Sequence, residues 1–178
     1  MRVGRPHPET NVDKKTSERS RAVTWQDPMI SANAVRAGLS GIDFLRKIRD
    51  GEIPEPPIAA LLGFSLTVVE PGFAVFECDP GEHHYNPIGV VHGGLACTLL
   101  DSAMSCAIQT TVPADSGYTT LELKVNLVRA ITAKTGHLRS EGKLIHGGAR
   151  IGTAEGKLID AEGKVYAHGT TTCIILAP

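Results

Sequence analysis

Residues 95–112 read LACTLLDSAMSCAIQTTV, a stretch long enough for a helix of roughly five turns. The apolar residues go nearly all the way round such a helix, so it should be buried on most sides. A helix of this kind needs an apolar partner over most of its surface. Residues 113–117, which begin with Pro113, end it.

The partner is predicted by stretches in which apolar and polar residues alternate with a period of two. Residues 64–70 and 73–79 form one pair, and Pro71-Gly72 between them favours a hairpin. Four more alternating stretches follow the helix: residues 119–131, 135–145, 150–160 and 164–176. This order predicts an α+β fold in which an antiparallel sheet wraps around one long central helix.

The residues before this core divide into two parts. Residues 1–39 begin with a polar, locally basic stretch and are predicted to be a flexible tail, or a segment that becomes ordered only against a partner subunit. Residues 40–55 are predicted to form a short helix, capped by Ser40 and stopped at Gly51, followed by a linker. Residues 56–178 then form the main domain.

Composition argues against several classes of function. The net charge of −1 gives no field that would attract nucleic acid or an anionic membrane, and aromatic residues make up only 4% of the 178 residues. The four cysteines are widely spaced, as free thiols in a reducing compartment would be. The sequence shows no leader-like opening and no apolar run long enough to span a bilayer, so we expect a cytoplasmic protein.

The tripeptide His-Gly-Gly occurs twice. At residues 146–148 it lies between two alternating stretches, where glycines allow the positive φ of a hairpin turn, so His146 is predicted to be a turn or strand-end residue. At residues 92–94 it directly precedes the long helix. The N–H groups of Gly93 and Gly94 would there be unpaired donors at the positive end of the helix dipole, suited to an oxyanion hole. The alternative is a plain glycine pair with a histidine that caps the helix.

Asp101 lies inside the apolar helix, where an unpartnered carboxylate would be costly to bury. It could face solvent, pair with a base such as Arg129, or cap nearby backbone. It could instead act in a pocket, as a nucleophile or as the base that activates water. Eight helical residues, a rise of roughly 12 Å, separate it from Gly93, so one carbonyl group cannot touch both. Joint action would require antiparallel helices from two subunits, and therefore a two-fold dimer.

Together these residues resemble a known family. Asn86 followed by residues 92–94, then Asp101 eight residues beyond Gly93, and then the phrase TTLELKVNLVRA, are similar to the hotdog-fold acyl-CoA thioesterases, in particular the phenylacetic-acid-degradation (PaaI-like) branch. The resemblance covers residues 56–176. It implies a homodimer, or a dimer of dimers, that hydrolyses an aryl- or medium-chain acyl-CoA to the free acid and CoA without a cofactor.

The resemblance also implies roles for single residues. Gly93 N–H would bind the thioester carbonyl oxygen, and Asp101 of the other subunit would activate water as a general base. Covalent attack is the less favoured role, because Asp leaves more room for a water than the Glu of another branch. Asn86 would orient the water or the thioester, His92 would support the loop, and Thr120 would help to hold the water.

Substrate contacts are implied for Gly94 and for Arg129. Ser105, one turn beyond the acid, would hydrogen-bond to Asp101 or to substrate. Arg129, Arg150 and Lys124 are basic residues suited to the phosphates of CoA, although solvated strand ends explain them equally well.

The remaining histidines carry weaker predictions. His83 and His84 either line the entrance or belong to a solvated loop, and the second reading is favoured. No set of histidines, cysteines and carboxylates has the spacing of a metal site, so we expect neither a metal nor a cofactor.

Two other functions fit the sequence less well. A hydratase or dehydratase of the same fold would be expected to pair Asp101 with a histidine on the long helix, and this helix has none. A dimer that binds acyl-CoA without catalysis would keep the same polar residues only to satisfy its core.

Overall fold

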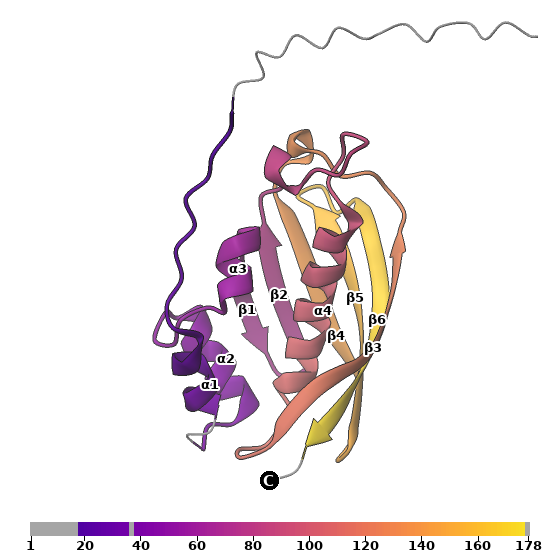
Figure 1. The fold of residues 1–178 in the computed structure, drawn as a ribbon. Helices are drawn as coiled ribbons and strands as arrows, with labels where there is room; N and C mark the ends of the chain where they lie inside the picture. The colour runs from indigo at the N-terminus through magenta and orange to yellow at the C-terminus, as the bar shows by residue number, and fades with distance from the viewer. Residues whose placement is uncertain (1–17, 36–37, 177–178) are drawn as a thin grey trace, which may run out of the picture.

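A computed structural model describes residues 18–35 and 38–176 (Figure 1). At its centre lies helix α4, Gly93–Gln109, and a six-stranded antiparallel sheet wraps around it. The strands are β1 (Phe64–Glu70), β2 (Phe73–Cys78), β3 (Gly117–Leu127), β4 (Leu138–Gly147), β5 (Ile151–Asp160) and β6 (Val165–Leu176), in the order β1-β2-β4-β5-β6-β3 across the sheet. The predicted fold, an antiparallel sheet around one long helix, is confirmed.

Helix α4 fills the concave side of the sheet. Leu99, Leu100, Met104 and Ile108 are completely buried, as the nearly all-round apolar pattern predicted. The helix ends at Gln109, three residues earlier than predicted, because the hydroxyls of the next two threonines bond back to carbonyl oxygens of its last turn. In the part of the chain that the structure describes, no helix is long and apolar enough to cross a membrane.

Glycines let α4 approach the middle of the sheet closely. Gly142 of β4 and Gly156 of β5 lie directly opposite each other. A Cβ atom on Gly142 would overlap the carbonyl oxygen of Ala103, and one on Gly156 would come within 2.7 Å of Cγ of Met104. The sheet can therefore carry no side chain at these two positions without moving away from the helix.

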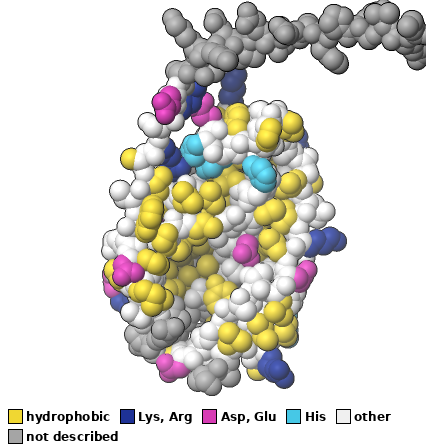
Figure 2. All heavy atoms as spheres, viewed as in Figure 1, with side chains coloured by type: hydrophobic (Ala, Val, Ile, Leu, Met, Phe, Trp, Pro, Cys, Tyr) yellow, Lys and Arg dark blue, Asp and Glu magenta, His cyan; other side chains and the backbone are white. Residues whose placement is uncertain are grey.

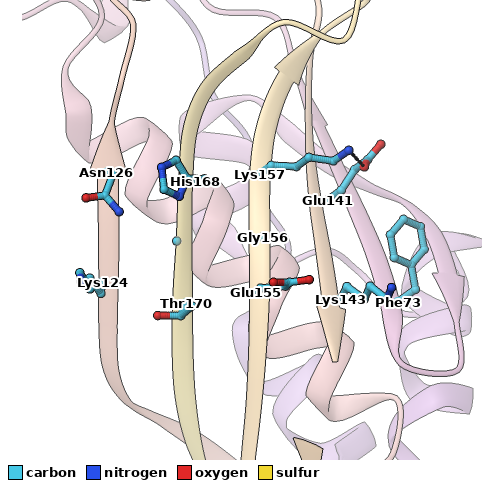
Figure 3. A pocket seen from close by; sticks show the side chains of 11 residues that line it. Phe73, Lys124, Asn126, Glu141, Lys143, Glu155, Gly156, Lys157, His168 and Thr170 are labelled. Carbon is cyan, nitrogen blue, oxygen red and sulfur yellow. Dashed lines mark ion pairs between the residues drawn. The ribbon is translucent and has the colours of Figure 1, made fainter. Parts of the chain in front are cut away.

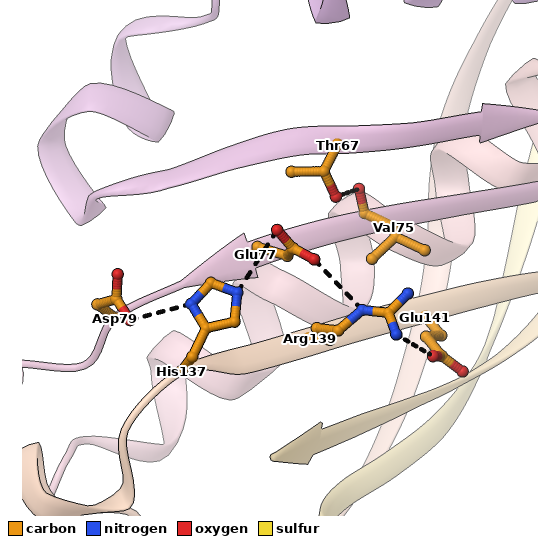
Figure 4. A network of polar contacts seen from close by, with 7 residues as sticks. All are labelled: Thr67, Val75, Glu77, Asp79, His137, Arg139 and Glu141. Atoms are coloured by element: carbon orange, nitrogen blue, oxygen red, sulfur yellow. Dashed lines mark hydrogen bonds and ion pairs between the residues drawn. The ribbon is translucent and has the colours of Figure 1, made fainter. Parts of the chain in front are cut away.

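The opposite face of the sheet carries a chain of ion pairs (Figure 4). His137 lies 3.0 Å from Asp79, whose hydrogen bond and charge raise the pKa of His137. Arg139 lies 3.3 Å from Glu77 and 3.5 Å from Glu141. Exposed pairs contribute only about 0–1 kcal/mol each. Their main effect is on register, since a slip of one residue would bury these charges beneath α4.

Three short helices lie beside β1 (Figure 1): α1 (Pro28–Val35), α2 (Gly41–Arg49) and α3 (Pro57–Leu62). Ser40 caps α2 by accepting a hydrogen bond from the backbone of Asp43, and Gly51 follows the helix with a φ of 76°, so the predicted cap and stop are both present. Helix α1 falls inside the segment predicted to be a tail, and Ser31 ties it to the Pro54 carbonyl at 2.8 Å. Residues 1–17 of that segment lie outside the described residues.

The β4–β5 turn was predicted for the wrong reason. Neither Gly147 nor Gly148 has a positive φ. A Cβ atom on Gly148 would instead come within 2.8 Å of the His146 ring and 3.0 Å of the Ile151 carbonyl oxygen. Glycine is needed there for close packing, whereas the β1–β2 turn does use a positive φ, 73° at Gly72.

The close approach of α4 predicts unequal costs for two glycine substitutions. Gly142→Ala should lower the free energy of unfolding by about 1–3 kcal/mol, because the new methyl group overlaps backbone and overpacks the core. Gly117→Ala is the matched control, since its Cβ would meet Leu176 at an ordinary 3.7 Å. Urea denaturation measures both, and equal stabilities would contradict the close approach.

Candidate active site

Asp101 is half buried in the middle of α4. Its Oδ1 accepts a hydrogen bond of 3.0 Å from the hydroxyl of Thr120 on β3, and no other donor to it lies within the described ranges, 18–35 and 38–176. Arg129 does not pair with it, because the guanidinium donates to the carbonyl of Val165 at 3.3 Å. The structure therefore brings together Asp101 and Thr120, two of the residues that the resemblance assigned to catalysis.

Asp101 lines a cavity of about 350 Å³. Most of the wall is apolar and comes from α2, α3, β1 and β2: Phe44, Leu45, Ile48, Pro56, Ile58, Ala59, Phe64, Leu66 and Phe76. Asp101, Ser105 and Gln109 lie at intervals of four along α4 and form a polar strip on one side. An apolar hollow with few polar groups is typical of a small-molecule site.

The molecular surface around α4 is also rich in apolar side chains. Figure 2 looks at the molecule from the side of α4 and shows hydrophobic side chains over much of this face.

Ser105 was predicted to bond to Asp101 or to substrate. Its hydroxyl instead makes a long contact, 3.5 Å, with the carbonyl of Ser102, and it lines the cavity.

Burial raises the pKa of three other ionisable groups of the cavity. Burial raises the pKa of the Cys106 thiol to about 12, and the charge of Asp101 adds to this. Burial also raises the pKa of Tyr118 well above its usual range and raises the pKa of Glu55. A thiolate nucleophile at Cys106 is therefore disfavoured at neutral pH, because thiolates and not thiols attack carbonyl groups.

The start of α4 presents one unpaired donor. His92 is the N-cap residue, and its Nδ1 accepts the N–H of Gly94 at 2.8 Å, so the capping role considered for this histidine is present. No acceptor for the N–H of Gly93 lies among the described residues. Only Gly93 thus keeps a free N–H at the positive end of the helix dipole. The Gly94 N–H, predicted to bind substrate, is already taken.

Asn86 and Gly93 line a different hollow from that of Asp101. Its volume is about 310 Å³, Arg129 also lines it, and it shares no lining residue with the Asp101 cavity. The Asn86 Oδ1 accepts the N–H groups of Ile88 and Val90 at 3.1 and 3.3 Å, which closes the loop before α4. Within one chain, the structure does not bring Asp101 and Gly93 together, as the helix geometry predicted.

His84 supports the loop of Gly93 and is buried, so the solvated-loop prediction is wrong for His84, whereas His83 is exposed as predicted. It is 7% exposed, its Nε2 lies 2.9 Å from the carbonyl of Leu62, and its Nδ1 accepts the N–H of Gly81. Its own carbonyl accepts the N–H of His92 at 2.8 Å. Burial lowers the pKa of His84, so the ring favours its neutral form.

A further hollow, of about 630 Å³, lies on the face of the sheet away from α4 (Figure 3). Its walls mix lysines and glutamates, and Lys157 is paired with Glu141 at 3.2 Å. Of the predicted contacts to CoA, Lys124 lines this groove and is therefore on the wrong face for the cavity of Asp101. No group of three or more metal-ligating side chains occurs in the described part of the chain.

Comparison with known proteins identifies the family. Residues 88–167, which contain Gly93, Asp101 and Thr120, match the model of the thioesterase superfamily. Human acyl-coenzyme A thioesterase 13 is 30% identical over 115 residues, which are 61% of this chain and 76% of the human protein. The chain belongs to the thioesterase superfamily.

Solved structures agree with this assignment. A putative thioesterase related to phenylacetic acid degradation, from Ralstonia eutropha, is 27% identical with a TM-score of 0.66, over 73% of this chain and 98% of that one. A variant of the PaaI protein from Thermus thermophilus is 26% identical with a TM-score of 0.60, over 66% and 97%. The protein is thus a hotdog-fold thioesterase of the PaaI-like branch.

The neutral state of His84 predicts how this thioesterase responds to acid. The unfolded chain protonates His84 near a pKa of about 6.5, whereas the folded chain does so only at lower pH. The unfolded state therefore binds more protons, and the free energy of unfolding should fall as the pH drops below that value, levelling off below the folded pKa.

Urea denaturation at pH 7.5 and 5.5 tests this for wild type and His84→Gln, whose amide can still donate to Leu62. The variant should lose less stability on acidification than the wild type. His137→Gln is the control, because the pKa of His137 is raised, so removing it should have the opposite effect. Identical pH slopes for all three proteins would contradict the assignment.

Proposed function

We propose that this thioesterase hydrolyses an aryl- or medium-chain acyl-CoA at a site that two subunits share. The observation that carries the proposal is the Asp101 carboxylate, held by Thr120 at the wall of an apolar cavity of about 350 Å³. An apolar cavity of about 150 Å³ can hold benzene. The cavity therefore has room for one aromatic ring or a medium acyl chain beside the acid.

Asp101 would act as a general base. Oδ1 accepts from Thr120, which leaves Oδ2 for a water molecule. The carboxylate takes a proton from this water as the water oxygen attacks the carbonyl carbon of the thioester. The oxyanion is stabilised by the N–H of Gly93 from the partner subunit. When it collapses, the C–S bond breaks and the protonated Asp101 gives its proton to the leaving thiolate sulfur, so the products are the free acid and CoA. In this scheme His92 and Asn86 position the loop, and the Asn86 amide is free to orient the thioester.

The shared site requires a dimer, and two surfaces support one. Strand β3 is an edge strand with an unpaired side, and long exposed edges are normally covered. Large apolar side chains lie exposed in β3 and just after it: Leu121 at 57%, Leu127 at 56% and Val128 at 54%. A partner that paired along β3 would cover these residues, and a two-fold axis there would set two α4 helices antiparallel.

Coenzyme A would enter through the hollow beside Gly93. Arg129 lines that hollow and its guanidinium suits a phosphate, so we retain it as a contact to CoA. The proposed reaction uses water, the carboxylate of Asp101 and the N–H of Gly93, and so needs no cofactor.

Replacement of Asp101 tests the base. Asp101→Asn keeps the shape and the bond from Thr120, so the protein should fold while kcat falls about 10²–10⁴-fold. Free thiol release from a panel of acyl-CoA substrates measures this.

Glu55→Gln is the discriminating variant, because Glu55 lines the same cavity. If Glu55→Gln lost most of its activity while Asp101→Asn stayed active, the general base would be Glu55 and not Asp101. No thiol release by the wild type would favour an acyl-CoA-binding dimer or a hydratase.

Mixed dimers test whether the site is shared. Gly93→Pro removes the N–H at the first helical position, where the helix backbone accepts proline, and its Cβ, which would lie 2.5 Å from Leu127 Cδ1, displaces the end of that side chain. The variant should lower kcat about 10²–10³-fold. Mixing it with Asp101→Asn after unfolding and refolding should restore about a quarter of wild-type activity, because half of the dimers contain one intact site. A site built within one chain would give no recovery.

A further inference from the structure

Three side chains close the cavity of Asp101 at the end of α4. Phe44 of α2, Gln109 of α4 and Tyr118 of β3 line that cavity, and they also line a second hollow of about 180 Å³. They are the three residues that the two hollows share. We call this set the end wall, because it separates the cavity of about 350 Å³ from the smaller hollow.

The end wall lies at a fixed distance from the carboxylate. Gln109 follows Asp101 by eight residues on one face of α4, which is about 12 Å along the helix axis. Ser105 lies halfway between them and also lines the cavity. An acyl group whose carbonyl carbon lies at Asp101 would therefore extend along this face and meet the end wall.

Helix α2 is held firmly against the end of α4. The N–H of Gly41 donates to the carbonyl of Val112 at 3.0 Å, and a Cβ atom on Gly41 would overlap the backbone of Gln109. Phe44 and Gln109 are 8% and 9% exposed. Tyr118 is partly buried and packs against the core, so the wall is built from packed side chains.

We propose that Phe44, Gln109 and Tyr118 set the maximum length of the acyl group that this enzyme accepts. The inference rests on the proposed function, since it takes Asp101 as the reacting end of the cavity. It makes α2 an element of substrate specificity, although α2 lies outside residues 88–167, which match the thioesterase family model. Acyl groups that stop at the wall fit, and longer ones collide with the ring of Phe44.

Shortening the side chain of Phe44 should join the two hollows. The test compares kcat/KM for two acyl-CoAs: the best substrate of the wild type and one whose acyl chain is two carbons longer. In Phe44→Ala, the ratio of the longer substrate to the shorter should rise at least about ten-fold, because one methylene changes kcat/KM roughly 10- to 200-fold in such pockets. Phe44→Leu should shift the same ratio less and keep α2 better packed. Thiol release from straight-chain acyl-CoAs of increasing length gives the profiles, and thermal melting shows that each variant is folded.

Two apolar residues near the wall provide controls. Ile42→Ala removes similar packing from α2 but lines neither hollow, and Leu39→Ala enlarges only the second hollow. Both should keep the wild-type profile, and a shift equal to that of Phe44→Ala would overturn the assignment to the wall. The assignment would also be overturned if the wild type is active and the folded variants Phe44→Leu and Phe44→Ala both keep its chain-length profile. A wild type that hydrolyses no acyl-CoA would instead refute the proposed function itself, and this inference with it.

Discussion

The close packing of α4 against the sheet is the constraint on which the rest of the structure depends. Where Gly142 and Gly156 lie under the helix, backbone meets backbone and leaves no space for side chains. Packed interiors resist such small displacements because every atom already has neighbours at contact distance. The rotation and height of α4 are therefore fixed, and Asp101 leaves the helix at the wall of the cavity. Its carboxylate stays where the hydroxyl of Thr120 reaches it.

One rigid helix consequently carries three chemically different positions. Gly93 offers a free N–H at its start, Asp101 an acid in its middle, and Gln109 a polar side chain at its end. Eight residues, or about 12 Å along the helix axis, separate Gly93 from Asp101 and again Asp101 from Gln109. Because an α-helix is straight, the Gly93 N–H and the Asp101 carboxylate of one chain are too far apart to contact the same thioester. In the proposed dimer the donor serves the neighbouring chain, while the half from Asp101 to Gln109 receives the acyl group.

The sequence predicted the features that periodicity and local chemistry determine, and the site only in part. The two-residue alternation predicted the strands, and the all-round apolar pattern predicted α4. His84 is buried because the Leu62 carbonyl lies against its ring across 22 residues of chain, and no local pattern reports that contact. The Gly94 donor was assigned to substrate because a sequence does not show which N–H its capping side chain will satisfy. Thr120 was assigned through the family resemblance to holding the water, and its bond to Asp101 appears only in the structure. The end wall joins three elements that only the fold brings together.

Two carboxylates, those of Asp101 and Glu55, line the cavity, and their surroundings differ in a way that separates their roles. Burial raises the pKa of Glu55, which favours its neutral form. Asp101 instead accepts a hydrogen bond of 3.0 Å from the hydroxyl of Thr120, which orients its carboxylate. Asp101 also projects from the central helix α4, whereas Glu55 belongs to the connection between α2 and α3. In the proposed mechanism these positions favour Asp101 as the base, because a general base must lie within hydrogen-bond reach of the water that it activates.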